Sequence, residues 1–143
     1  MRRFEWIQHP HQISPLLEIW REVFHTEQGI ELAHIYQKSA GEHHYVILWE
    51  QEEIIGCGRL SIASAKAGRL SRIAVRKSYR GQGLGRQIID QLEKMAQSFS
   101  LTSLQLTPHL HLESFYASLG YRRLQEAHIM LDRFPLLRMG KKF

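Results

Sequence analysis

Apolar residues along this chain repeat with two different periods, and the period changes from one segment to the next. Residues 44–49 and 54–62 are rich in β-branched and aromatic side chains, and the polar residues 51–53 between them are typical of a turn, so the two runs predict a β-hairpin. Residues 69–75 alternate apolar and polar positions, which predicts a further strand. Residues 84–99 repeat apolar side chains at three- and four-residue intervals, which predicts a helix with one buried face.

The order of the elements in the middle of the chain predicts the type of sheet. The strand over 69–75, the helix over 84–99 and a strand over 103–107 follow one another directly. A crossover through a helix makes the two flanking strands parallel, with a right-handed connection, whereas the hairpin is antiparallel. We therefore expect the α/β (α+β) class, with a mixed, mostly antiparallel sheet.

The segments near the two ends of the chain predict shorter elements. Residues 1–8 alternate well enough for a first strand, and Ser14-Pro15 indicates a helix start with the serine as N-cap. A short helix is expected over 112–119 and a last strand over 126–131. The basic and apolar tail over 134–143 has no predicted structure.

Composition favours one globular domain. The chain has 143 residues, of which 43% are hydrophobic and 23% charged, which suits a single core. Charges interrupt the apolar runs well before the roughly 20 residues that span a bilayer, and the N-terminus lacks a signal-peptide pattern. We therefore expect a soluble, cytoplasmic protein with no membrane partner. Its one cysteine, Cys57, excludes an internal disulfide and lies in an apolar stretch, where we expect it to be packed.

The basic residues are concentrated in one stretch. The net charge is +5 and the pI is about 9.6, yet no acidic residue lies between Glu53 and Asp90. The basic residues of that stretch are Arg59, Lys66, Arg69, Arg72, Arg76, Lys77, Arg80 and Arg86. Nucleic-acid binders interleave stacking aromatics with such residues, whereas Tyr79 is the only aromatic between Arg59 and Arg86. We therefore expect no nucleic-acid partner and favour a small polyphosphate ligand.

The sequence RGQGLG, residues 80–85, joins the strand over 69–75 to the helix over 84–99. A helix N-terminus has unpaired backbone N–H groups and a partial positive charge, and glycines lack the Cβ that would keep a ligand at a distance. The turn has neither the Gly-Lys-Ser/Thr ending of a nucleotide P-loop nor the pattern Gly-x-Gly-x-x-Gly. It therefore predicts a phosphate cradle of another kind.

The same residues resemble a family signature. RGQGLG is similar to the acetyl-CoA motif Gln/Arg-x-x-Gly-x-Gly/Ala of the GNAT superfamily of acetyl-CoA-dependent N-acetyltransferases, with matches at Arg80, Gly83 and Gly85. The later sequence FYASLGY, residues 115–121, resembles the family's Phe-Tyr-x-x-x-Gly-Phe/Tyr. REVFHTEQ, residues 21–28, resembles a stretch of the ElaA-like branch.

The resemblance implies a fold and an activity. The fold is a single GNAT domain over 1–143, whose parallel strands 69–75 and 103–107 splay apart and whose sheet has helices on both faces. The activity is direct transfer of the acetyl group of acetyl-CoA, the co-substrate, to a primary amine of a small molecule or peptide (class EC 2.3.1). The coenzyme-binding residues that it implies are Ile73, Ala74, Val75, Arg80, Gly81, Gln82, Gly83, Leu84, Gly85 and Arg86. Tyr116 would protonate the departing thiolate, and a plain core position fits the same residue.

The base that deprotonates the amine is less defined, because position 72 holds arginine where glutamate often serves in this superfamily. His111 and His128 are the preferred candidates, since a histidine pKa of about 6.5 suits a base at neutral pH. His109 and Glu27 are the alternatives. With nine histidines in the chain, a surface or structural position fits any one of them as well.

Two other interpretations stay open at this point. Three histidine pairs have the spacing of ligand pairs but lack a cysteine or a clear acidic partner, so we expect no metal. These pairs are His9 and His11, His43 and His44, and His109 and His111. A non-catalytic acetyl-CoA-binding module is the alternative function: Tyr116 and the candidate bases favour the enzyme, and the missing glutamate keeps the module open. The acceptor amine and the oligomeric state, a homodimer included, are left open.

Overall fold

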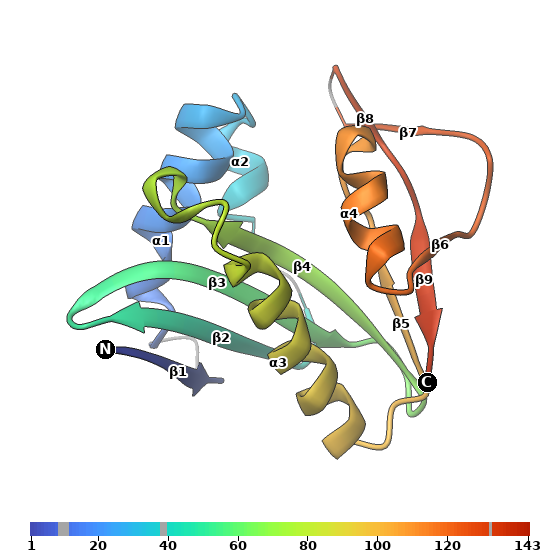
Figure 1. Ribbon diagram of the computed structural model, residues 1–143. Coiled ribbons are helices and arrows are strands. Elements are labelled where there is room, and N and C mark those ends of the chain that lie inside the picture. Colours follow the sequence, from blue (N-terminus) through green and yellow to red (C-terminus); the bar gives the residue numbers. More distant parts are fainter. Residues whose placement is uncertain (9–11, 38–39, 132) are drawn as a thin grey trace.

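The computed structural model describes residues 1–8, 12–37, 40–131 and 133–143, and they form a mixed sheet with helices on both faces (Figure 1). The strands are β1 (Arg2–Ile7), β2 (His43–Glu50), β3 (Glu53–Ile62), β4 (Ala67–Val75), β5 (Ser103–Leu106), β6 (Arg122–Arg123), β7 (Ile129–Leu131), β8 (Phe134–Leu136) and β9 (Met139–Lys142). The helical segments are α1 (Ser14–Trp20), the π-helical η2 (Arg21–Glu27), α2 (Leu32–Ile35), the 3₁₀ turns η3 (Lys77–Tyr79) and η4 (Leu110–Leu112), α3 (Leu84–Ser98) and α4 (Glu113–Ser118).

The main sheet has the strand order β1-β2-β3-β4-β5-β9-β6. Only the β4–β5 pair is parallel, and every other neighbouring pair is antiparallel, which confirms the predicted mixed sheet. The parallel pairing runs from Ala67 opposite Ser103 to Arg69 opposite Gln105 and then stops. Beyond it the two strands diverge, as Figure 1 shows.

Two apolar cores hold the layers together. One face of the sheet packs against α3 and α4, through a cluster that includes Leu60, Leu70, Ile88 and Leu92. The opposite face packs against α1, η2 and α2 through a second cluster that includes Ile47 and Cys57. Cys57 is 1% exposed, which confirms the packed position expected for it. The helices of the two faces thus lie on either side of β3 and β4.

The C-terminal tail corrects one expectation. Residues 134–143 had no predicted structure, but β9 lies between β5 and β6 in the main sheet. Lys141 of β9 donates from Nζ to the carboxylate of Glu93 on α3 (3.1 Å to Oε2), which also accepts a hydrogen bond from the Tyr121 hydroxyl (2.8 Å). The tail is a sheet strand because its partners, remote in sequence, supply both backbone pairing and a partly buried ion pair.

Two smaller differences concern where elements begin. Ser14 is the first residue of α1 rather than its N-cap, because Ile13 already has a helical backbone and accepts the first bond, from Leu16 N at 2.8 Å. The strand expected over 126–131 is shorter, Ile129–Leu131, and pairs with β8 in a separate two-stranded sheet. In the described part of the chain, none of the helices has the length and apolar character needed to cross a membrane.

Gly56 on β3 allows the close approach of α3. We expect Gly56→Ala to lower the free energy of unfolding by about 1–3 kcal/mol, since the new Cβ would lie 2.8 Å from Cδ1 of Ile88. Ile88→Val removes the Cδ1 methyl group. The double variant should therefore lose less free energy of unfolding than the sum of the losses of the two single variants. Urea unfolding of the three variants measures this coupling, and strictly additive losses would contradict the packing of α3 on β3.

Candidate functional site

The turn between β4 and α3 presents an open backbone surface. Gly81 and Gly83 have φ values of +79° and +78°, a conformation that favours glycine, and a Cβ at either position would meet no atom within 4 Å. Gly83 is the N-cap of α3, and the N–H of Gln87 donates to Gly83 O at 3.2 Å. The N–H groups of residues 84–86 precede that first helical bond, so they lack an intrahelical acceptor. Together these features form an anion-binding surface at a helix N-terminus.

Two arginines hold this turn against the rest of the protein. Arg80 donates from Nε to Val75 O (2.9 Å) and pairs through Nη1 and Nη2 with the two carboxylate oxygens of Glu27 on η2 (2.8 and 3.1 Å). Arg2 of β1 donates from Nη2 to Oε1 of Gln82 (2.8 Å). The turn is therefore fixed from both sides before any ligand binds.

Part of the positive charge of the basic stretch is neutralised by acidic residues from elsewhere in the chain. Arg76 pairs with Glu22 (2.6 Å) and Arg80 with Glu27, so acidic residues of η2 compensate charges that have no nearby acid in the sequence. Within the described parts of the chain, Lys77 and Arg86 have no ion-pair partner. The positive charge available to a ligand at the turn thus comes from these two side chains and from the helix N-terminus.

A cleft of about 1130 Å³ begins at this turn and extends between β4 and the segment that includes η4 and α4. Its lining includes most of the predicted site residues: Ile73, Ala74, Val75, Arg80, Gly81, Gly83, Leu84, Gly85, Arg86, His111 and Tyr116. Gln82, which is bound by Arg2, and His128 are not part of this lining. The cleft occupies the gap where β4 and β5 have stopped pairing.

A β-bulge bends β4 beside the cleft. The β3–β4 register shifts between Cys57 and Arg59, and Arg72 has a φ of +54°. The Arg72 guanidinium donates from Nη2 to the carbonyl oxygens of His34 and Ile35 at the end of α2 (3.2 Å each). Burial, reinforced by the charge of Arg59, lowers the pKa of Arg72. Arg72 therefore anchors α2 to the bulge and does not replace a catalytic carboxylate.

Tyr116 on α4 combines a packed ring with a position in the cleft lining. The residue is 6% exposed, and its ring makes edge contacts with Phe115 (5.0 Å between centroids) and Tyr121 (6.0 Å). Burial raises the pKa of Tyr116 to about 12, so the hydroxyl keeps its proton near neutral pH. Within the described residues, no hydrogen-bond acceptor is recorded for this hydroxyl. Tyr116 can therefore be both a core residue and a proton donor.

The structure brings His109 and His111 into the cleft lining and leaves His128 exposed outside it. The rings of His109 and His111 are 5.7 Å apart, and Nε2 of His109 lies 3.1 Å from Oε1 of Gln28, which follows η2. With the Gln28 oxygen as acceptor, Nε2 donates and Nδ1 is the free acceptor. Burial and the neighbouring His111 lower the pKa of His109, so its imidazole is neutral at pH 7.

Glu27, the remaining candidate base, has both carboxylate oxygens bound by Arg80. The sequence motif REVFHTEQ contains both Glu27 and Gln28, but its role in the site depends on contacts with residues 53 and 81 positions away. Those contacts could not be predicted from the motif. Glu27, His109 and His111 all line the cleft, and of these Glu27 is bound by Arg80.

A family model described as "Acetyltransferase (GNAT) domain" matches residues 11–143. The chain is a member of the GNAT family. A Bacillus subtilis protein with an inferred acetyltransferase activity is 32% identical over 128 residues, which cover 87% of this chain and 86% of that protein. Membership implies acyl-CoA-dependent acetyl transfer, as in transferases of class EC 2.3.1.

Solved structures agree with the GNAT fold. An inferred N-acetyltransferase from Lactobacillus plantarum is 25% identical, with a TM-score of 0.88 and coverage of 99% of this chain and 97% of that one. Escherichia coli ElaA is 21% identical, with a TM-score of 0.84 and coverage of 99% and 100%. The likeness to ElaA shows a shared fold, and membership of the ElaA-like branch stays a prediction.

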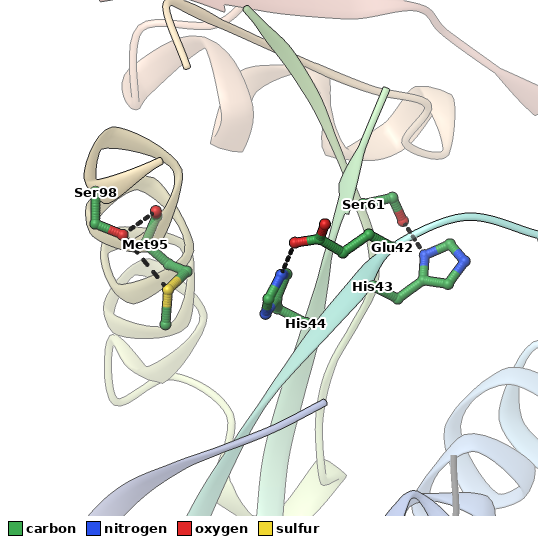
Figure 2. Close-up of polar contacts among 6 residues, drawn as sticks. All are labelled: Glu42, His43, His44, Ser61, Met95 and Ser98. Carbon is green, nitrogen blue, oxygen red and sulfur yellow. Dashed lines mark hydrogen bonds and ion pairs between the residues drawn. The ribbon is translucent and has the colours of Figure 1, made fainter. Parts of the chain in front are cut away.

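His43 and His44, considered as a pair of metal ligands, contact different partners in this GNAT protein. His43 Nδ1 contacts Ser61 Oγ (2.7 Å) and His44 Nε2 contacts Glu42 Oε2 (2.6 Å), and Figure 2 shows the two rings directed to these different partners. His9 and His11 lie outside the described residues. Among the residues described, no three His, Cys, Asp or Glu side chains group as metal ligands.

Proposed function

We propose that this protein transfers the acetyl group of acetyl-CoA directly to a primary amine while both substrates are bound. The observation that carries the proposal is one continuous cleft that is lined both by the glycine turn and by Tyr116 and His109. A phosphate cradle and a pair of proton-transfer groups are what a direct acetyl transfer requires.

The turn would hold the coenzyme by its diphosphate. The backbone N–H groups of residues 82–86 point to this role because they lie at a helix N-terminus behind open glycines, and Lys77 and Arg86 add uncompensated charge. The pantetheine arm would lie beside Ile73, Ala74 and Val75, where β4 has lost its parallel partner and can offer backbone groups. The thioester would then lie near the middle of the cleft.

The reaction needs a base, an oxyanion donor and an acid. A lysine-like amine has a pKa of about 10.4 and attacks only when neutral, so His109 would accept its proton at Nδ1, directly or through water. A backbone N–H near Ala74 or Val75 would stabilise the tetrahedral oxyanion. As the C–N bond forms and the C–S bond breaks, Tyr116 would give its proton to the thiolate. His111 lines the cleft beside His109 and is the second candidate base, whereas His128 is not part of the lining.

Tyr116→Phe should lower kcat by about 100-fold or more, because it removes a general acid but keeps the packed ring. The measurement is thiol release from acetyl-CoA across a panel of primary amines. Binding of acetyl-CoA to the variant should be unchanged.

Tyr121→Phe is the matched control for this experiment. It makes the same change in a ring 6.0 Å away, whose hydroxyl binds Glu93, so it should lower stability and leave kcat unchanged. Equal turnover by the Tyr116→Phe variant and the unchanged protein would eliminate the proton-donor role. Coenzyme binding without thiol release for any amine would instead support the non-catalytic module.

The pH profile tests the base. The neutral imidazole is the active form, so kcat should fall as pH decreases through the pKa of His109, which is held below its ordinary 6.5. His109→Gln should lower kcat and abolish this acidic limb, while His128→Gln, at an exposed position, should keep it. An acidic limb that persists in His109→Gln and is lost in His111→Gln would assign the base to His111.

A further inference from the structure

A second cavity, of about 400 Å³, continues from the proposed acetyl-transfer site. It shares five lining residues with the larger cleft, and these are Gln28, Ile73, His109, Leu112 and Tyr116. It lies on the far side of Tyr116 and His109 from the glycine turn, since no residue of the turn lines it. An acceptor in this cavity would meet the acetyl group at the shared residues.

The lining of the second cavity combines apolar side chains with neutral polar ones, and its charged side chains are cationic. Its apolar side chains include Phe24 of η2, Ile30 between η2 and α2, Ile35 of α2, Leu106 of β5, Leu131 of β7 and Leu136 of β8. Its charged side chains are Arg69 and Arg72 of β4, and among the described lining residues there is no carboxylate. A polycationic acceptor would therefore lose hydration and gain no opposite charge here.

Among the described residues, the arginines at this cavity lack the carboxylate partners that several other arginines of the protein have. Arg76, Arg80 and Arg123 each pair with a glutamate. Arg69 and Arg72 pair with no acidic side chain in the part of the chain that the structure describes. The cavity therefore has a net positive potential.

Neighbouring contacts decide which of these arginines can reach a ligand. The Arg72 guanidinium is committed to two carbonyl oxygens of α2, and its Nε is buried without an acceptor. Arg59, on the neighbouring strand β3, donates from Nε to Ser71 Oγ (2.8 Å), and its charge helps to lower the pKa of Arg72. Arg69 is exposed, and its one side-chain hydrogen bond to the described residues is long, 3.5 Å from Nη1 to Thr107 Oγ1. Arg69 therefore keeps free donors at the cavity rim.

We propose that the acceptor is an amine that also carries a carboxylate on an apolar skeleton, and that Arg69 binds this carboxylate. A guanidinium offers two parallel N–H donors that match a carboxylate, and the charges of Arg59 and Arg72 strengthen the attraction. The inference rests on the proposed function and adds the substrate class and a specificity-determining residue.

The test compares ligands that differ only in the carboxylate. The amine pairs are leucine with isoamylamine, phenylalanine with phenethylamine, and ε-aminocaproate with pentylamine. The N-acetyl derivatives of the same six compounds are titrated into the protein saturated with coenzyme A, and their dissociation constants are measured by calorimetry. At least one carboxylate should bind about tenfold or more tightly than its neutral partner, as expected for a charge-assisted hydrogen bond.

Arg69→Gln should reduce that preference to near one, with little effect on the neutral ligand. Arg122→Gln, a change of an exposed arginine on β6, should leave the preference intact. Neutral partners that bind as tightly as every carboxylate, or a preference that survives Arg69→Gln, would overturn the inference. Thiol release with the six amines is recorded in parallel. Its absence would count against the proposed function, while the binding comparison still decides the role of Arg69.

Discussion

The parallel pairing of β4 with β5 lasts for three residue pairs, and the gap beyond it is the constraint on which the functional part of the protein depends. Up to the last pair, Arg69 with Gln105, the two strands pair within one sheet that covers the apolar core. Toward the C-terminal end of β4, beyond that pair, the strand bends at the bulge near Arg72. The edge of β4 that no longer pairs with β5 there faces η4 and α4. The cleft and the second cavity are the two ends of this opening.

Polar contacts help to fix the elements around the opening. Arg80 links the glycine turn to η2 through Glu27, and Arg72 links the bulge to α2. On the opposite side, Glu93 joins α3 to β9 through Lys141. Because Arg80 and Arg72 are already bound to the protein, the turn proposed to bind the coenzyme would need little rearrangement.

The sequence predicts those features that depend on neighbouring residues. The hairpin, the strand over 69–75, the glycine turn and the helix after it are all local patterns, and the structure has each of them near its expected bounds. The position of β9 could not be predicted, because its partners lie tens of residues earlier in the chain. For the same reason, a stretch without acidic residues suggested a strong positive field at the turn, whereas η2 supplies Glu22 and Glu27 from more than fifty positions away. The contact between His109 and Gln28 is another long-range feature of this kind.

The central claim is that the open backbone at Gly83 receives the coenzyme. The most direct measurement is the dissociation constant of acetyl-CoA for Gly83→Ala, compared with that for Gly41→Ala. Both glycines have a positive φ (+78° and +103°) and nothing within 4 Å of an added Cβ, but only Gly83 lines the cleft. Both variants should therefore lose similar stability, about 1–2 kcal/mol, while only Gly83→Ala should bind acetyl-CoA more weakly, by tenfold or more. Equal affinity of the two variants for acetyl-CoA would contradict the claim.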